Sequence, residues 1–185
     1  MINQSINYRN DDILIEAVLE SGDEQAFRDL YRRHAPRLLG FVTRLFAGQS
    51  SENEDIVQET WVRACENLGN FQRRSAFSTW LLGIGLNVVR DNLRRNRRHN
   101  TAREIGTDNS HARTNDHEMR IDLQRAISML PDDNRMVMVL HDIEGFTHDE
   151  IAIRLEIPVG TSKSQLFRAR RMIRDWLTES NGAKP

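Results

Sequence analysis

The sequence predicts an all-α protein made of two small helical domains joined by a flexible linker. Apolar residues recur at three- and four-residue spacings over most of the chain, and no stretch alternates apolar and polar residues with period two. A polar segment at 96–116 interrupts this pattern with small and charged side chains that could not form a core. We therefore expect a first domain at 1–95, the linker at 96–116 and a second domain at 117–185.

The first domain is expected to contain successive amphipathic helices. One spans 24–46, where Pro36 should kink or break it because proline lacks an N–H, and its apolar stripe comprises Phe27, Leu30, Tyr31, Leu38, Phe41, Val42 and Leu45. The next spans about 52–68 before Gly69, and its inward residues are Ile56, Val57, Thr60, Trp61 and Ala64. A further helix should cover about Thr79–Arg95.

Three sequence pairs have the spacing of a capping box, in which a hydroxyl and a carboxylate three residues later satisfy the free N–H groups of a helix start. They predict helix starts at Ser21 with Glu24, Ser51 with Glu54, and Thr147 with Glu150.

Composition excludes several classes of protein. The single cysteine, Cys65, excludes an intramolecular disulfide framework and a cysteine-based zinc cluster. No apolar run approaches the roughly 18–20 residues of a membrane helix, and the N-terminus lacks the plan of a signal peptide. These features predict a soluble cytoplasmic protein.

Charge is segregated along the chain, although the net charge is only −1. Residues 11–24 carry six acids and no base, residues 90–103 carry six arginines and one aspartate, and residues 163–174 carry five bases and no acid. The net charge argues against a uniformly basic nucleic-acid binder. The two basic segments nevertheless place arginines where a helix face could meet phosphates.

The second domain contains a helix-turn-helix pattern. An apolar stripe resumes with Met119, Leu123, Ile127 and Leu130, and Pro131 should occupy the first position of the next helix. Thr147 then begins a short helix whose inward residues are Ile151, Ala152 and Leu155. A turn at 156–160 is expected to contain Ile157 as a plug between the helices, and a basic helix should begin near Thr161 with Leu166, Ala169 and Ile173 buried.

The exposed face of that basic helix carries donors suited to base edges and phosphates in the major groove. Its candidate DNA-binding residues are Thr161, Lys163, Ser164, Gln165, Arg168 and Arg171. Two positions depart from the usual pattern, since Glu156 replaces a glycine and Ser162 replaces an apolar residue. Each departure should cost on the order of 1 kcal/mol.

The first domain adds two candidate sites. Asp55, Gln58 and Glu59 share one helix face at spacings i, i+3 and i+4. Downstream, Phe71, Phe77 and Trp80 are interleaved with Arg73, Arg74, Ser75, Ser78 and Thr79 before a helix that carries Asn87, Arg90, Arg94 and Arg95. Aromatic rings with arginines and hydroxyls at such a junction can hold an unstacked base. Alternatively Phe77 and Trp80 belong to the core, which is the stronger alternative for Trp80.

The order of these motifs resembles the extracytoplasmic-function (ECF) sigma factors, the smallest sigma-70-type initiation subunits of bacterial RNA polymerase. Residues 22–34 look like the start of their sigma-2 domain, and EDIVQETW is similar to their polymerase-binding helix. FQRRSAFSTWLLGIGLN is similar to their promoter-melting loop and helix, and residues 130–171 look like sigma-4.

The resemblance implies a role for each site. Asp55, Gln58 and Glu59 would bind the coiled coil of the polymerase β′ subunit. The −10 element of promoter DNA would be held by Arg73, Ser75, Ala76, Phe77, Trp80, Asn87 and Arg90, with Arg73 standing where the family often has glycine. The helix-turn-helix residues would face the −35 element. The resemblance implies no cofactor and no metal, and it implies control by an anti-sigma factor that can hold the protein at the membrane.

Two other classes of function are alternatives to an ECF sigma factor. A stand-alone helix-turn-helix regulator of the LuxR type shares the C-terminal signature but leaves residues 54–95 unexplained. An enzyme is disfavoured, because neighbouring carboxylates such as Asp11 and Asp12 diverge on a helix, no phosphate-binding loop occurs and the six histidines are scattered. Cys65 is expected to be a buried, inert thiol.

Overall fold

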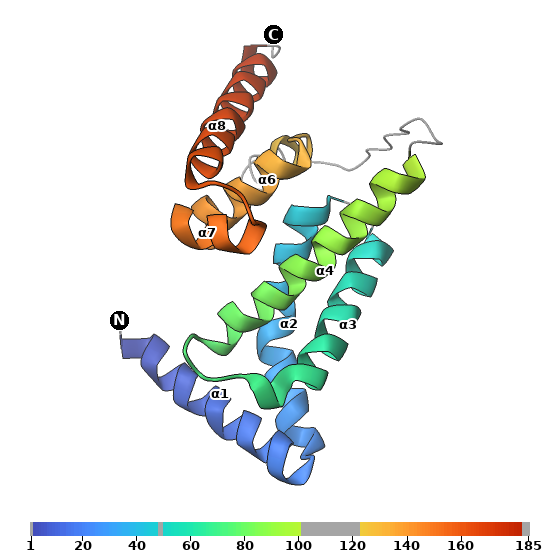
Figure 1. Ribbon diagram of the computed structural model, residues 1–185, viewed down its shortest axis with the longest axis vertical. Coiled ribbons are helices and arrows are strands. Elements are labelled where there is room, and N and C mark those ends of the chain that lie inside the picture. Colours follow the sequence, from blue (N-terminus) through green and yellow to red (C-terminus); the bar gives the residue numbers. More distant parts are fainter. Residues whose placement is uncertain (1, 48–49, 101–122, 183–185) are drawn as a thin grey trace. The chain divides into compact units, whose positions relative to one another are not determined.

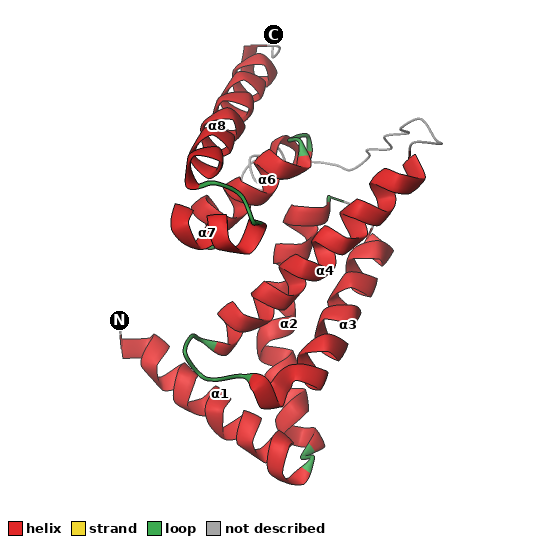
Figure 2. Ribbon diagram, viewed as in Figure 1, coloured by secondary structure: helices red, strands yellow, loops and turns green. Residues whose placement is uncertain are grey.

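The computed structural model describes residues 2–47, 50–100 and 123–182. Every regular element in these residues is a helix (Figure 2), as the sequence predicts. The chain divides into two compact units, one formed by residues 1–43 with 48–98 and the other by 44–47 with 99–185. The predicted linker begins as helix, because α4 continues to Asn100; residues 101–116 and Met119 lie outside the described residues.

The first unit consists of four α-helices and one 3-10 turn within the described residues (Figure 1). They are α1 (Ile2–Ser21), α2 (Glu24–Phe46), α3 (Ser50–Asn67), η1 (Leu68–Asn70) and α4 (Phe77–Asn100). The apolar stripe of α2 forms the centre of the core, since Leu30, Leu38, Phe41, Val42 and Leu45 are all at most 1% exposed. Phe27 and Tyr31 lie at its edge.

Pro36 does not break α2, which is continuous around it. A proline costs one backbone hydrogen bond in a helix interior. The fully buried side chains that follow it stabilise the second half of α2 by more than this loss, at about 1.5–3 kcal/mol for each buried Leu, Val or Phe.

The packing of α3 and α4 against α2 depends on small residues at the contact. All five inward residues predicted for α3 are buried, and the Oγ1 of Thr60 donates to the carbonyl of Ile56 at 2.7 Å. A Cβ on Gly85 of α4 would lie 2.9 Å from Cδ1 of Leu38 and 3.6 Å from Cγ2 of Thr60. Gly85 therefore allows the three helices to approach closely.

The second unit contains a helical stretch at 123–128 and then α6 (Asp132–Met138), η2 (Val139–Ile143), α7 (His148–Leu155) and α8 (Val159–Gly182). Its core is formed by one face of each element. The buried residues include Ile127, Leu130, Val137, Leu140, Ile151, Ala152, Leu155, Leu166, Ala169 and Ile173. The helix-turn-helix pattern is confirmed, although α8 begins two residues earlier than expected and Ile157 is only half-buried.

Only the last of the three predicted capping boxes forms. The hydroxyl of Thr147 accepts from the N–H of Glu150, and the Glu150 carboxylate accepts from the N–H of Thr147. The prediction at Ser21 is wrong, because Ser21 is the last residue of α1 and its hydroxyl donates to the carbonyl of Ala17. The prediction at Ser51 is also wrong, since α3 already includes Ser50.

Two other helix starts differ from the prediction. Asp23 caps α2, with its Oδ1 accepting from the N–H groups of Gln25 at 2.8 Å and Ala26 at 3.1 Å. Pro131 is the residue before the first turn of α6 rather than its first helical residue. The start of α2 lies two residues later than predicted, at Asp23, because the Asp23 carboxylate caps the helix. The first helical residue of α6 lies one residue later, at Asp132.

We expect Asp23→Ala to destabilise the first unit by about 1 kcal/mol, because it leaves two N–H groups at the start of α2 without their acceptor. The check is urea unfolding followed by tryptophan fluorescence in a Trp176→Phe background, where only Trp61 and Trp80 report. Ser21→Ala is the control and should change the midpoint little. Equal effects of the two substitutions would contradict the cap assignment.

Candidate nucleic-acid interface

The loop between η1 and α4 rests on a row of aromatic rings. Phe77 is the centre of this row and has its ring centroid 5.7 Å from Phe71, 5.6 Å from Trp80 and 6.3 Å from Trp61. Phe71 and Trp80 also contact each other, at 5.2 Å between centroids. These tilted and edge-on contacts are the favourable arrangements for aromatic pairs. The loop 71–76 therefore has a rigid apolar floor.

The two aromatic candidates of α4 have different surroundings. Phe77 is only 3% exposed and belongs to the core, whereas Trp80 is half-buried at the edge of the loop. From the sequence, Trp80 was the stronger candidate for the core. In the structure Trp80 can offer part of its ring to a base, and Phe77 supports it from below.

The other candidates of the loop and of α4 are exposed or half-buried. Ser75 is exposed, Ala76 is half-buried and its carbonyl accepts from the N–H of Trp80 at 3.1 Å, so Ala76 fixes the start of α4. Asn87 is exposed and Arg90 half-buried. Their spacing from Trp80 of seven and ten residues places all three along one face of α4.

Arg73 holds the loop in a left-handed turn. Its φ is +55°, a conformation that normally favours glycine. Its guanidinium is paired with α1, with Nε 3.4 Å from Oδ1 of Asp12 and Nη2 2.8 Å from Oε1 of Glu16. The loop thus keeps the turn that glycine would allow, although arginine occupies the position.

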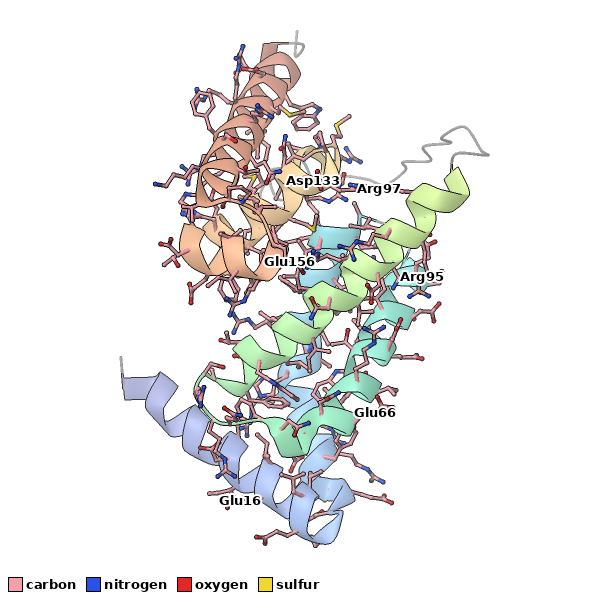
Figure 3. The ribbon with its side chains drawn as sticks, in the orientation of Figure 1. Glu16, Glu66, Arg95, Arg97, Asp133 and Glu156 are labelled. Atoms are coloured by element: carbon pink, nitrogen blue, oxygen red, sulfur yellow. The ribbon has the colours of Figure 1, made fainter. Side chains whose placement is uncertain are left out.

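The three polar candidates of α3 share the face opposite its buried stripe. Asp55 and Gln58 are exposed. Glu59 is half-buried, because its carboxylate pairs with Arg63 at 2.6 Å and with Arg95 of α4 at 3.7 Å. Figure 3 labels Arg95 on α4. The structure therefore brings the acidic face of α3 beside the basic end of α4.

Two residues of this face were missed or misjudged from the sequence. Val62 is 58% exposed and lies four residues after Gln58, so it adds an apolar contact to the polar face. Cys65 is exposed rather than buried. Partial burial of its thiol, together with the nearby Glu66 carboxylate, raises the pKa of Cys65. Val62 and Cys65 lie four and seven residues after Gln58, and this helical spacing was the signal that both share its exposed face.

Most candidate residues of α8 lie outside its buried stripe, but the Oε1 atom of Gln165 is buried. Lys163, Ser164, Arg168 and Arg171 are exposed, whereas Thr161 and Gln165 are half-buried. Arg171 lies 3.7 Å from Asp175 in a pair within the helix. Phe167, which received no role from the sequence, is 69% exposed between these polar side chains. Its position next to the buried Leu166 was the signal that could have placed it on the open face.

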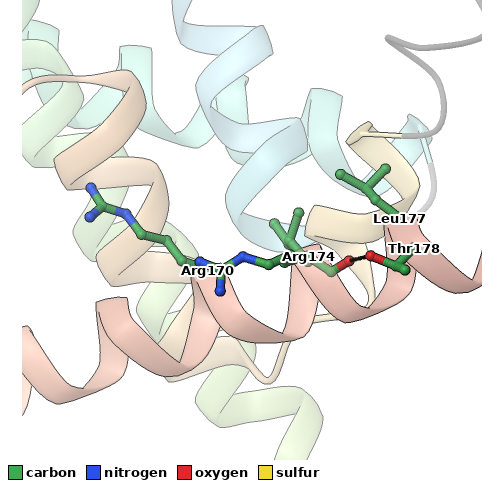
Figure 4. A pocket seen from close by; sticks show the side chains of 5 residues that line it. Arg170, Arg174, Leu177 and Thr178 are labelled. Carbon is green, nitrogen blue, oxygen red and sulfur yellow. Dashed lines mark hydrogen bonds between the residues drawn. The ribbon is translucent and has the colours of Figure 1, made fainter.

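Two grooves run along α8. One is lined by His148, Lys163, Leu166, Phe167, Arg170, Arg171, Arg174 and Asp175. The other is lined by Arg170, Ile173, Arg174, Leu177 and Thr178 (Figure 4). In Figure 4 the hydroxyl of Thr178 donates to the carbonyl of Arg174 at 2.8 Å. Both grooves combine arginines with apolar walls, a mixture suited to an anionic or amphipathic partner.

A group of polar side chains, here called the histidine cluster, joins η2, α7 and α8. It consists of His141, Asp142, His148, Ser162 and Arg170. The His141 and His148 rings lie 4.6 Å apart, and Asp142 pairs with both His141 and Arg170. Its hydrogen bond from Arg170 holds the pKa of Asp142 below its usual value.

The two unusual positions of the helix-turn-helix are both accommodated. Glu156 adopts φ +58° and ψ +45°, so it takes the left-handed conformation of the expected glycine. Ser162 is fully buried, and its Oγ lies 2.9 Å from Nδ1 of His148. The histidine cluster therefore satisfies the hydroxyl that replaces an apolar side chain.

Comparison with known proteins agrees with this arrangement. Residues 30–99 match the family model for Sigma-70 region 2, and residues 120–173 match Sigma-70, region 4. The chain is 30% identical to the RNA polymerase sigma-H factor of Pseudomonas aeruginosa over 183 residues, covering 91% of this chain and 94% of that protein. It belongs to the ECF sigma factors. A second relative, the ECF RNA polymerase sigma-E factor of Haemophilus influenzae, is 32% identical and covers 88% of this chain and 93% of its own length.

Two solved structures have the same fold. CnrH in complex with the cytosolic domain of CnrY matches with a TM-score of 0.61 at 28% identity, covering 92% of this chain and 98% of that one. The sigma factor RpoE of Bartonella quintana, in complex with the anti-sigma factor NepR, matches with a TM-score of 0.64 over 82% of this chain and 96% of its own. At 24% identity the latter match shows the fold alone.

As an ECF sigma factor the protein directs RNA polymerase to promoters and binds DNA. None of the helices that the structure describes is both long and apolar enough to span a membrane. Likewise, the described part of the sigma factor contains no group of three His, Cys, Asp or Glu side chains that could hold a metal ion.

The histidine cluster predicts a pH dependence for the second unit. Desolvation, then the charges of His141, Lys163 and Arg170, lower the pKa of His148 below its ordinary 6.5. The unfolded chain therefore binds this proton more readily than the folded chain does. We expect stability to be unaffected well above pH 6.5 and to fall as the pH drops below it.

The titration of His148 can be followed by NMR of its ring proton, assigned by comparison with His148→Gln. A midpoint below 6.5 is expected for the folded chain. A midpoint at or above 6.5 would contradict the effect of the surrounding cations.

Proposed function

We propose that this sigma factor uses three surfaces: the acidic face of α3 to bind polymerase, and the loop 71–76 with α4 and the exposed face of α8 to recognise the promoter. The observation that carries the proposal is the loop itself. It joins a buried aromatic floor to a half-exposed tryptophan, and the polar residues Asn87 and Arg90 follow along one face of α4. Such a surface suits an unstacked base attached to a phosphate backbone.

The acidic face of α3 is proposed to bind the coiled coil of the polymerase β′ subunit. Asp55 and Gln58 are exposed and Glu59 is kept in place by Arg63 and Arg95. Exposed carboxylates next to an apolar Val62 fit a partner helix that carries arginines and an apolar contact.

The −10 element is proposed to bind at the loop, where Ser75, Ala76, Phe77 and Trp80 shape a pocket for one nontemplate base. Asn87 and Arg90 would continue the contact along the strand, and Arg73 belongs to the same loop. Unstacking one base costs a few kcal/mol, and stacking on an aromatic ring returns about 1–3 kcal/mol. One pocket thus only roughly balances the cost, so binding to polymerase must stabilise the open DNA.

The −35 element is proposed to bind α8 in its major groove. The six residues of this contact are Thr161, Lys163, Ser164, Gln165, Arg168 and Arg171. Arginine and lysine would bind phosphates or guanine, whereas the hydroxyl and amide groups would bind other base edges.

The proposed partner list is core RNA polymerase, promoter DNA and an anti-sigma factor, the last because sigma factors of the same fold have been solved with one. We further propose a cytoplasmic location, with attachment to the membrane only through such a partner. The protein itself would be a regulatory subunit without catalytic activity.

The first test is binding to bacterial core RNA polymerase. We expect the triple variant Asp55→Ala, Gln58→Ala, Glu59→Ala to bind about a hundredfold more weakly, since three lost contacts of about 1 kcal/mol each amount to about 3 kcal/mol. Co-elution in size-exclusion chromatography and a titration of labelled protein measure this.

The matched control for that experiment removes the same three residue types from the start of α2, as Glu24→Ala, Gln25→Ala and Asp29→Ala. It should bind as the natural chain does. Equal loss in both variants would refute the assignment of the α3 face.

A second test concerns the −35 contact. We expect Arg171→Gln to weaken binding of the holoenzyme to its selected promoter duplex and to reduce the slope of log K against log salt by about 0.9, as expected for one lost phosphate contact. Arg28→Gln removes an exposed arginine in the first unit and should leave the slope unchanged. An unchanged slope for Arg171→Gln would exclude a phosphate contact there.

A further inference from the structure

The loop 71–76 is tied to α1 by the side chain of Arg73. Asp12 and Glu16 lie one turn apart on α1, and both carboxylates contact the same guanidinium, at 3.4 and 2.8 Å. Figure 1 shows the loop running beside α1, and Figure 3 labels Glu16 on this helix. Nε and Nη2 of Arg73 are therefore directed to protein carboxylates.

A second set of contacts fixes α1 beneath the loop. Asp11 is 5% exposed, and its carboxylate accepts from Arg33 of α2 and lies 3.0 Å from Nε2 of His34. Burial opposes its charge, but the contacts with His34 and Arg33 prevail and lower the pKa of Asp11. The His34 ring in turn meets Phe77 edge-on at 5.1 Å. The floor of the loop and its outer turn thus both depend on consecutive acids of α1.

The ion pairs of Arg73 stabilise the left-handed backbone conformation of this residue. A residue other than glycine is strained at φ +55°, so the turn needs support from its surroundings. The two ion pairs supply it from α1. This helix precedes residue 30, where the match to the Sigma-70 region 2 model begins.

We propose that α1 is a brace for the loop 71–76 and that Arg73 is a positioning residue. It holds the loop in the shape that receives a base, instead of contacting DNA itself. The inference rests on the proposed function of the loop in binding the −10 element. It assigns Asp12 and Glu16 a role in promoter recognition, although both are acidic and Arg73 offsets only one of their two negative charges.

The brace is tested first in the free sigma factor, without DNA. We expect Arg73→Gln and Glu16→Gln each to speed hydrogen exchange of the amides in residues 72–76 by about three- to fivefold, the size of a partly exposed ion pair. The double variant should match Arg73→Gln, because that substitution alone removes both ion pairs, whereas Glu16→Gln leaves the pair with Asp12 and should have the smaller effect. Glu20→Gln, an exposed acid one turn further along α1, is the control and should have no effect.

Binding to DNA then separates positioning from direct contact. The probe is a labelled single-stranded oligonucleotide carrying the −10 sequence of a promoter selected by the holoenzyme. We expect Arg73→Gln to weaken its binding to holoenzyme by about threefold and Glu16→Gln by at most as much, both with an unchanged salt slope, and the double variant to match Arg73→Gln.

Two results would overturn the proposal. If Arg73→Gln lowers the salt slope by about 0.7 while Glu16→Gln binds as tightly as the natural chain or more tightly, Arg73 contacts a phosphate directly. If exchange is unchanged in both variants, the ion pairs do not support the loop.

A Trp80→Ala variant distinguishes failure of the brace from failure of the proposed function. Loss of DNA binding in Trp80→Ala, with no effect of Arg73→Gln or Glu16→Gln, refutes the brace alone. Unchanged binding in all three variants would show that the loop does not hold the −10 strand, which would refute both.

Discussion

The packing of Phe77 is the constraint on which the first unit depends. Its ring contacts His34 of α2, Trp61 of α3 and Trp80 of its own helix, so one side chain fixes three helices at the point where the core reaches the surface. Because Phe77 is also the first residue of α4, the same contacts decide where the preceding loop must end. The loop proposed to bind DNA is exposed and strained, and the packing of Phe77 beneath it keeps it in one conformation.

In the second unit, polar contacts rather than aromatic rings fix the position of a helix. The recognition helix α8 is joined to η2 by Asp142 and Arg170 and to α7 by Ser162 and His148. Directional hydrogen bonds fix the rotation of α8 about its own axis, which apolar contacts alone specify less sharply. That rotation determines which side chains face outward, so these polar contacts set the composition of the exposed basic face.

Helix identity and the core could be predicted from the sequence, because both follow from spacing. All five inward residues of α3, and Leu166, Ala169 and Ile173 of α8, are buried as the pattern indicates. The helix starts were less predictable, since Asp23 and Ser21 compete for the same helix end and spacing cannot rank them. The Arg73 pairs with Asp12 and Glu16 join residues about sixty positions apart, and a single sequence carries no sign of such a contact. Phe167 was given no role from the sequence, although it lies next to Leu166 and so outside the buried stripe of α8.

Fixed boundaries at both ends of α7 limit what the chain can change there. Thr147 closes one end through its capping box and Glu156 closes the other in a left-handed turn, leaving eight helical residues between them. Each inserted or deleted residue would rotate everything after it by about 100° and move it by about 1.5 Å along the axis. The basic face of α8 would then point elsewhere. We therefore infer that the length of α7 is more strictly constrained than the identity of its exposed residues, such as Ile153.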